Sequence, residues 1–212
     1  MNFRRKEVFG YRPLTEIGSE AGETPERAEY ASFCIEYEGG ERRKAFITLG
    51  RFISSLERAP YEPRRRFVSW LMSRTYKRRE NISRLIPHPL RARILEPTLL
   101  EWAEIEPENS EPHRWMGGYE HLKRAVDLQP DDEIARRELV LWILNRVAMN
   151  AHEIPAGYGY MGVPEEGLCS LAEADTLTSG LPSPEERAKT ASEIAVERAL
   201  IFEYLRRKGQ AD

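Results

Sequence analysis

Helix start and stop signals are the feature that most restricts the fold of this chain. Ser183 precedes Pro184 and two glutamates, an order typical of a helix N-terminus, because serine caps the helix and proline suits its first position. Three basic residues and then Gly209 end the segment, as expected at the negative end of a helix. The sequence therefore predicts a helix over 184–208. Its predicted apolar stripe consists of Ala188, Ala191, Ala195, Ala199, Phe202 and Leu205, widened by Ile194 and Ile201.

Helical spacing of apolar residues recurs along the rest of the chain. A helix is predicted over 131–151, and its centre, Leu139 to Met149, is apolar on nearly every side except at Asn145 and Arg146, so we expect it to be the most buried helix. Residues 153–167 hold four glycines and two prolines, which predicts a loop. Further helices are predicted over 42–58, from about Pro63, at about 90–95 and 98–105, and over 110–128 and 164–177. The expected fold is all-α, built from antiparallel helical hairpins or an irregular bundle.

The segment 30–49 leaves a second architecture open. Its first half fits both a helical and an alternating pattern, and Gly39 and Gly40 could form a hairpin turn. The alternative is therefore an α+β fold with a small β-hairpin at about 30–49. In either case we expect a flexible arm over 1–22 and a single domain over 23–212.

Charge is distributed unevenly along the sequence. The formal net charge is −3, but residues 42–93 hold 15 basic and 3 acidic residues, whereas residues 94–212 hold 12 basic and 23 acidic ones. Thirteen of the 15 cations are arginine, which favours bidentate pairing with carboxylate or phosphate. The sequence thus predicts a basic N-terminal half and an acidic C-terminal half, neutralised either within the fold or by a partner.

A proline period suggests a repeat. Pro63, Pro97, Pro130 and Pro164 are separated by 34, 33 and 34 residues. Residues 102–142 resemble a tetratricopeptide repeat, because small and large apolar residues stand where that family has them. They are Trp102, Ile105, Gly118, Leu122 and Ala125 before Pro130, and Leu139 after it. The resemblance implies paired antiparallel helices and a concave surface that binds a protein or peptide.

Two groups of side chains are the binding candidates. The arginines would contact an acidic partner, and the aromatic and histidine residues would line a binding surface, although each also suits a packed core. The candidates are Arg64, Arg65, Arg66, Arg78, Arg79, His113, Trp115, Tyr119, Tyr158 and Tyr160.

Catalytic motifs are missing from the sequence. It contains no HExxH, no nucleophile elbow and no phosphate-binding loop, so we expect no catalytic residue, no cofactor and no metal. Cys34 and Cys169 are expected to be buried. The longest apolar run, 139–144, is too short to span a bilayer, and no secretory signal is visible, so we expect a cytoplasmic protein with no membrane contact.

These observations favour a non-enzymatic helical adaptor that binds a protein or peptide partner, suited by its arginines to an acidic one. An enzyme of unfamiliar type built on His113, Glu120, His121 and His152 is one alternative. Nucleic-acid binding through 42–93 ranks behind both, because the sequence pI of about 6.0 is far from that of a basic domain. The oligomeric state is not readable from the sequence.

Overall fold

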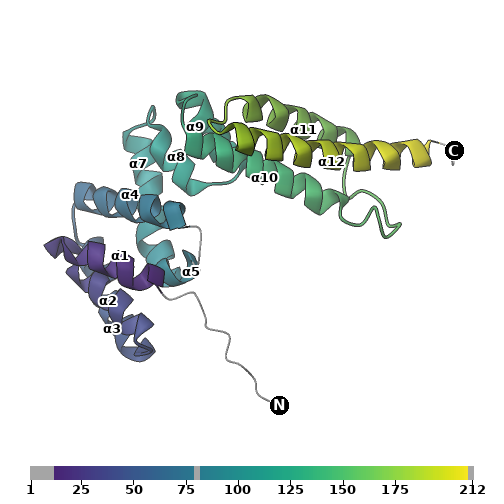
Figure 1. Cartoon of the computed structure of the whole chain (residues 1–212). Helices are drawn as coiled ribbons and strands as arrows, with labels where there is room; N and C mark the ends of the chain where they lie inside the picture. Colours follow the sequence, from purple (N-terminus) through teal and green to yellow (C-terminus); the bar gives the residue numbers. More distant parts are fainter. Residues whose placement is uncertain (1–11, 79–81, 210–212) are drawn as a thin grey trace, which may run out of the picture. The chain divides into compact units, whose positions relative to one another are not determined.

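Helices are the dominant structure of the described chain. A computed structural model describes residues 12–78 and 82–209, and every regular element within these ranges is a helix (Figure 1). The all-α prediction is confirmed. Residues 30–49 form two helices joined at Gly39 and Gly40 rather than a β-hairpin. Within the same ranges no helix has the length and apolar character needed to cross a membrane.

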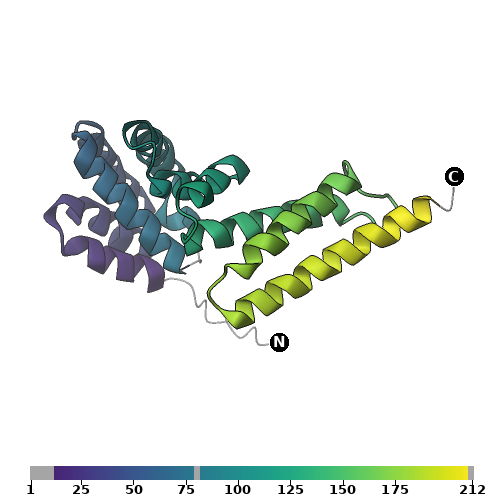
Figure 2. The same ribbon diagram turned by 90° about the horizontal axis from the view of Figure 1, so that it is seen from above.

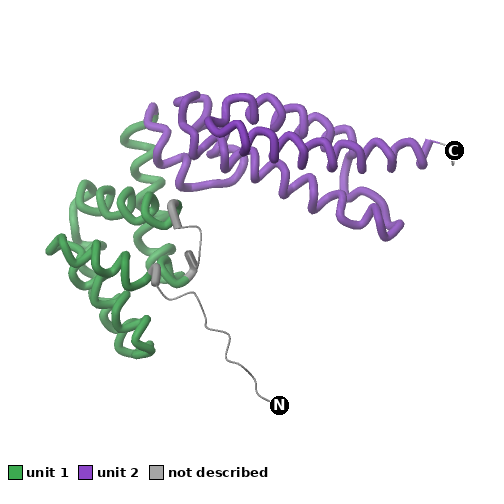
Figure 3. The backbone as a smooth tube through the Cα atoms, in the orientation of Figure 1, with its two compact units in different colours: residues 1–107 green, residues 108–212 purple. Residues whose placement is uncertain are grey.

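The chain divides into two compact units where the sequence suggested one domain. Unit 1 is residues 1–107 and unit 2 is residues 108–212 (Figure 3). The helices of unit 1 are α1 (Arg12–Gly22), η1 (Pro25–Arg27), α2 (Ala28–Glu38), α3 (Arg42–Glu57), α4 (Tyr61–Arg78), α5 (Ile82–Leu85), α6 (His88–Leu90), the π-helical turn η2 (Arg91–Leu95) and α7 (Glu96–Ile105). Those of unit 2 are α8 (Ser110–Met116), α9 (Tyr119–Leu128), α10 (Glu133–Ala151), α11 (Pro164–Ser179) and α12 (Pro184–Lys208).

The N-terminal helix of unit 1 corrects the prediction of a flexible arm over 1–22. Residues 12–22 form α1, which buries Leu14, Ile17 and Ala21 and packs against α2. These apolar residues recur at three- and four-residue spacing, so they form one face of a helix. The part of the predicted arm before residue 12 lies outside the described residues.

Aromatic side chains form the centre of unit 1. The Tyr30 ring is fully buried, lies 5.4 Å from that of Phe67 and 5.7 Å from that of Phe52, and its hydroxyl donates to the Leu85 carbonyl at 2.7 Å. Edge-on and tilted ring pairs at these distances add about 0.5–1.5 kcal/mol each beyond area burial. The core therefore ties α2, α3 and α4 to the last residue of α5.

Two short helices replace the single helix predicted over 110–128. Gly117 and Gly118 have φ angles of 70° and 75°, in the left-handed region that helices cannot contain. The chain therefore turns between α8 and α9, which pack against each other.

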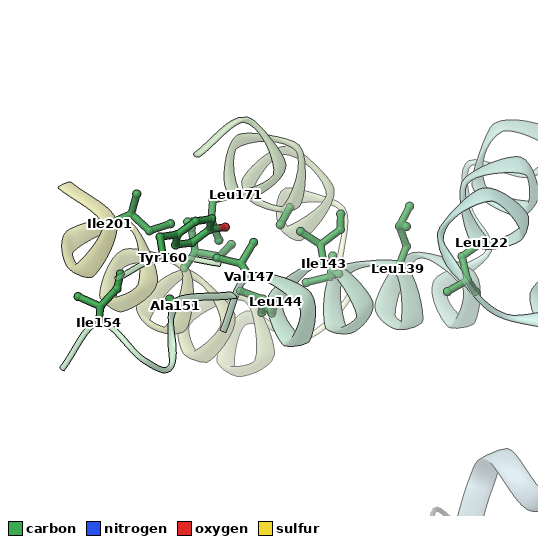
Figure 4. Packing of buried hydrophobic residues seen from close by; sticks show 13 residues of the cluster. Leu122, Leu139, Ile143, Leu144, Val147, Ala151, Ile154, Tyr160, Leu171 and Ile201 are labelled. Carbon is green, nitrogen blue, oxygen red and sulfur yellow. The ribbon is translucent and has the colours of Figure 1, made fainter. Parts of the chain in front are cut away.

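The helix predicted to be most buried is the centre of unit 2. Asp132 caps α10 by accepting a hydrogen bond from the Ala135 N–H at 3.0 Å. Its buried side chains include Leu139, Ile143 and Val147, which pack in one cluster with residues of α11 and α12 (Figure 4). Figure 2 shows α10, α11 and α12 extending along one another.

The final helix is confirmed, and its predicted inner face is correct only in part, since Ile194 and Ile201 are buried as expected but the alanines are not. Ser183 accepts a hydrogen bond from the Glu186 N–H at 3.2 Å and so caps α12 as expected. The buried residues of α12 are Thr190, Ile194 and Ile201. The predicted stripe instead faces solvent from Ala188 to Phe202. Larger side chains decide which face is buried because they remove more apolar area from water.

The residues behind the tetratricopeptide resemblance fall in both units. Trp102 and Ile105 lie on α7 in unit 1, with Trp102 fully buried and Ile105 exposed. Leu122 and Ala125 lie buried on α9 in unit 2. The helical pair α9–α10 turns at Pro130 as the resemblance implies, and the membership of that family stays a prediction.

Candidate functional site

A groove between α10 and α11 is the candidate site. It encloses about 460 Å³, lies wholly in unit 2 and is called the α10–α11 groove below. One end meets α9, and the other meets the loop before α11. Its lining residues are Tyr119, Trp142, Ile143, Arg146, Val147, Asn150, Tyr160, Met161, Gly162, Val163, Glu166, Gly167 and Ser170.

Two aromatic rings form the apolar wall of the α10–α11 groove at its α9 end. The Tyr119 and Trp142 rings are 5.4 Å apart and tilted by 40°. The Tyr119 hydroxyl donates to Glu173 at 2.8 Å. Burial and this carboxylate raise the pKa of Tyr119, so the phenol stays protonated and its donor is already used. The ring is thus fixed in position and presents its apolar face.

A guanidinium stands beside this wall. Arg146 is exposed, and its Cζ lies 5.3 Å from the centre of the Trp142 ring, within the range of a cation–π contact. No carboxylate of the described residues lies within ion-pair distance of Arg146, although Glu166 lines the opposite wall. The two walls of the groove therefore carry opposite charges.

A second polar group follows one turn later on α10. Asn150 lines the groove, and within the described parts of the chain its side-chain amide has no hydrogen-bond partner. Its main-chain carbonyl accepts from the Met161 N–H at 2.8 Å, which holds the loop against α10. An amide offers both a donor and an acceptor, as a peptide group does.

The loop between α10 and α11 covers the far end of the groove. Gly157, Gly159 and Gly162 all have φ between 88° and 108°, which lets the chain fold back sharply after α10. Tyr160 is buried beside Val147, Leu171 and Ile201 (Figure 4). Its ring packs over Gly167, where a Cβ would overlap the hydroxyl.

The structure brings together two of the three predicted tyrosine candidates and separates the third. Tyr119 and Tyr160 both line the α10–α11 groove. Tyr158 is 85% exposed and does not line it. Trp142, Arg146 and Asn150 were not among the candidates, although the polar interruption at Arg146 in an apolar helix was visible in the sequence.

The candidates His113 and Trp115 lie on α8. Trp115 is buried, and its indole N–H donates to Glu111 at 3.1 Å. The Nδ1 atoms of His113 and His121 are 3.2 Å apart. Two of the four residues of the enzyme alternative therefore converge, but no group of three or more metal-binding side chains occurs among the described residues.

The arginine candidates of α4 have unequal surroundings. Arg64 lies 2.8 Å from Glu101, and Arg65 donates twice to Glu62 at 3.0 Å while lying over the Trp102 ring. Arg66 is exposed and has no ion pair or hydrogen bond to an acidic side chain within the described ranges, although the hydrogen bonds from Arg65 and then the charge of Arg66 lower the pKa of Glu62. The side chain of Arg78, and Arg79 as a whole, lie outside the described residues.

The basic segment finds much of its neutralisation inside unit 1. That unit holds 20 basic and 16 acidic residues, and unit 2 holds 12 and 19, so the formal charges are +4 and −7. The local excess over 42–93 is therefore largely offset by acids that flank it in sequence. The paired cations include Lys44, Arg51, Arg64, Arg65, Arg74 and Arg93.

The two cysteines differ. Cys34 is buried as predicted, and burial raises the pKa of its thiol to about 12, which keeps it protonated and unreactive. Cys169 is exposed on α11, so the prediction for this residue is wrong. Its position is outside the groove lining.

Comparison of the chain with family models, with curated proteins and with solved structures finds no match.

Proposed function

We propose that the protein is a helical interaction module that binds a peptide segment of a protein partner in the α10–α11 groove. The observation that carries the proposal is Arg146, a guanidinium that lines an aromatic wall and has no carboxylate partner among the described residues. Aromatic and arginine side chains are enriched at the centres of protein interfaces because they combine apolar contact with a directed polar group.

The chemistry of the walls specifies the segment. A large apolar side chain would pack against Trp142 and Tyr119, and an acidic group beside it would pair with Arg146. The Asn150 amide would bond to the main chain of the segment. Glu166 on the opposite wall would repel a second acidic group, so the acidic end of the segment is expected to lie along α10.

A displayed peptide library tests the proposal on the full chain. We expect selected peptides to share an acidic residue next to a bulky apolar one and to bind with a dissociation constant of about 1–100 µM. The change Arg146→Glu should weaken binding about tenfold or more, because it places a like charge opposite the acidic group. Lys189→Glu is the matched control, since Lys189 is exposed on α12 outside the groove. Selection of no peptide, or binding unchanged by Arg146→Glu, would refute the proposal.

A further inference from the structure

The last helix has two apolar faces, and only one of them is covered. Thr190, Ile194 and Ile201 face the core of unit 2. A second set recurs at three- and four-residue spacing and is exposed, with Phe202 exposed by 54%. We call this set the α12 stripe. It consists of Ala188, Ala191, Ala195, Ala199 and Phe202.

Helix geometry shows that the two faces are distinct. At about 100° per residue, the α12 stripe occupies a sector about 80° wide, and its centre lies about 120° from that of the buried face. A helix on the surface of a monomer normally carries polar side chains there. Val196, exposed by 63%, widens the apolar surface further. Within the described parts of the chain, the stripe is thus an unpartnered helix face.

Charges flank the α12 stripe in an ordered way. The same helical projection places Glu185 and Glu203 along one edge, and Arg187 and Arg198 along the other. A two-fold axis parallel to the helix sets the acidic edge of one copy against the basic edge of the other. In an antiparallel pair, the acidic edges of the two copies would face each other and so would the basic edges. This repulsion between like charges costs free energy.

The polar groups near the end of the stripe permit such a contact. Arg206, which follows Phe202 by one turn, donates to Glu203 at 3.0 and 2.8 Å, and Arg207 donates to the same carboxylate at 2.8 Å, so Glu203 already has two arginine partners. Arg198 pairs with Asp175 at 3.1 Å on the basic edge. These exposed pairs leave the four alanines clear, and their small side chains allow two helices to approach closely.

We propose that the protein forms a parallel two-fold dimer in which the α12 stripe of one copy packs against the α12 stripe of a second copy. The α12 helix is about 37 Å long, so a contact along one face is smaller than a standard interface and gives a weak dimer. This proposal is independent of peptide binding in the α10–α11 groove.

Sedimentation equilibrium of the full chain between about 5 and 500 µM tests the proposal. We expect the mass to rise with concentration from monomer to dimer. Ala195→Glu and Phe202→Glu should each keep the chain monomeric, because they place two like charges at the contact. Ala172→Glu on α11 is the matched control, since it makes the same change at an exposed helical alanine and should leave the dimer intact. A monomer throughout this range, or a dimer that persists in Ala195→Glu, would overturn the proposal.

Cysteine cross-linking determines the direction of the helices. In a Cys169→Ser background, Ala188→Cys and Ala199→Cys are made separately, at positions about 16 Å apart along the helix. A parallel dimer should form a disulfide in each variant alone. Disulfides that appear only when the two variants are mixed would indicate an antiparallel pair and would overturn the parallel arrangement.

Discussion

The imidazole rings of His113 and His121 meet across the turn between α8 and α9, with their Nδ1 atoms 3.2 Å apart and their ring centres 5.4 Å apart. The distance between the ring centres exceeds the distance between the Nδ1 atoms by about the width of one imidazole ring. The two Nδ1 atoms therefore lie between the ring centres, close to the line that joins them. This geometry suits an N–H of one neutral ring that donates to the lone pair of the other. Two protonated rings would instead present two donors and two positive charges.

Acid should weaken this contact. Burial, the charge of His121 and the charge of Arg124 lower the pKa of His113 in the folded chain. The unfolded chain, with a histidine pKa near 6.5, then binds more protons in mild acid. The stabilisation is therefore complete above about pH 6.5 and is lost as the pH falls from there through the lower pKa of the folded state. Urea unfolding at pH 7.5 and pH 5.5 should show this loss.

The variant His113→Gln separates this effect from general acid destabilisation. It should reduce the difference in unfolding free energy between the two pH values, whereas His88→Gln, at an exposed histidine of unit 1, should not. NMR titration of the imidazole carbons should report a pKa for His113 below the ordinary value of histidine. A difference in unfolding free energy that His113→Gln leaves unchanged would show that the pair does not contribute.

Asp132 should be among the most sensitive polar positions of unit 2. Its side chain is almost fully buried, lies 2.8 Å from Arg114 and caps α10 through the Ala135 N–H. Asp132→Ala removes the cap and leaves a half-buried guanidinium without this partner, which should lower the unfolding free energy by about 3 kcal/mol. Asp132→Asn keeps an oxygen for the cap, so it should cost about half as much. Equal losses in chemical denaturation would show that the cap contributes nothing, and no loss in Asp132→Asn would show that the ion pair contributes nothing.

Gly167 and Tyr160 should show a coupled effect on stability. A Cβ at position 167 would overlap the Tyr160 hydroxyl, which is buried with no hydrogen-bond partner among the described residues. Gly167→Ala should therefore destabilise unit 2 by about 1–3 kcal/mol. Tyr160→Phe alone should be nearly neutral, since it removes an unpaired buried hydroxyl.

The double variant measures the overlap directly. Gly167→Ala combined with Tyr160→Phe should be more stable than Gly167→Ala alone, with a coupling of about 1 kcal/mol. Additive free energies of unfolding would place the strain of Gly167→Ala elsewhere, for example against Ile201.

Capping residues and apolar spacing predicted where the helices lie better than they predicted which face of each helix is buried. Ser183 and Asp132 stand directly before the helices that they cap, so α12 and α10 begin where capping chemistry requires. The pattern along α12 contained two apolar sets, and the choice between them depended on α10 and α11, which are distant in sequence. The alanines and Phe202 were therefore wrongly expected on the buried face, whereas Ile194 and Ile201 were expected there correctly.

The candidate site, too, could be predicted only in part, because its lining depends on packing between helices that are distant in sequence. Tyr119 and Tyr160 were both among the aromatic candidates, and both line the groove. Trp142 and Arg146 belong to a helix that is apolar nearly all round, so only the packing of α11 determines which of its sides remains open. Periodicity alone carries no information on that choice.

Two glycines in helices of unit 1 give a matched final prediction. Gly50 lies within α3, and a Cβ there would meet nothing within 4 Å. Gly50→Ala should raise the unfolding free energy by about 0.5–1 kcal/mol, because alanine loses less backbone entropy in a helix. A Cβ at Gly18 in α1 would lie 3.0 Å from the Cβ of Cys34, so Gly18→Ala should instead lower the stability by separating α1 from α2. Thermal unfolding of both variants checks the opposite signs. A stabilising Gly18→Ala would mean that α1 and α2 pack less closely than the structure describes.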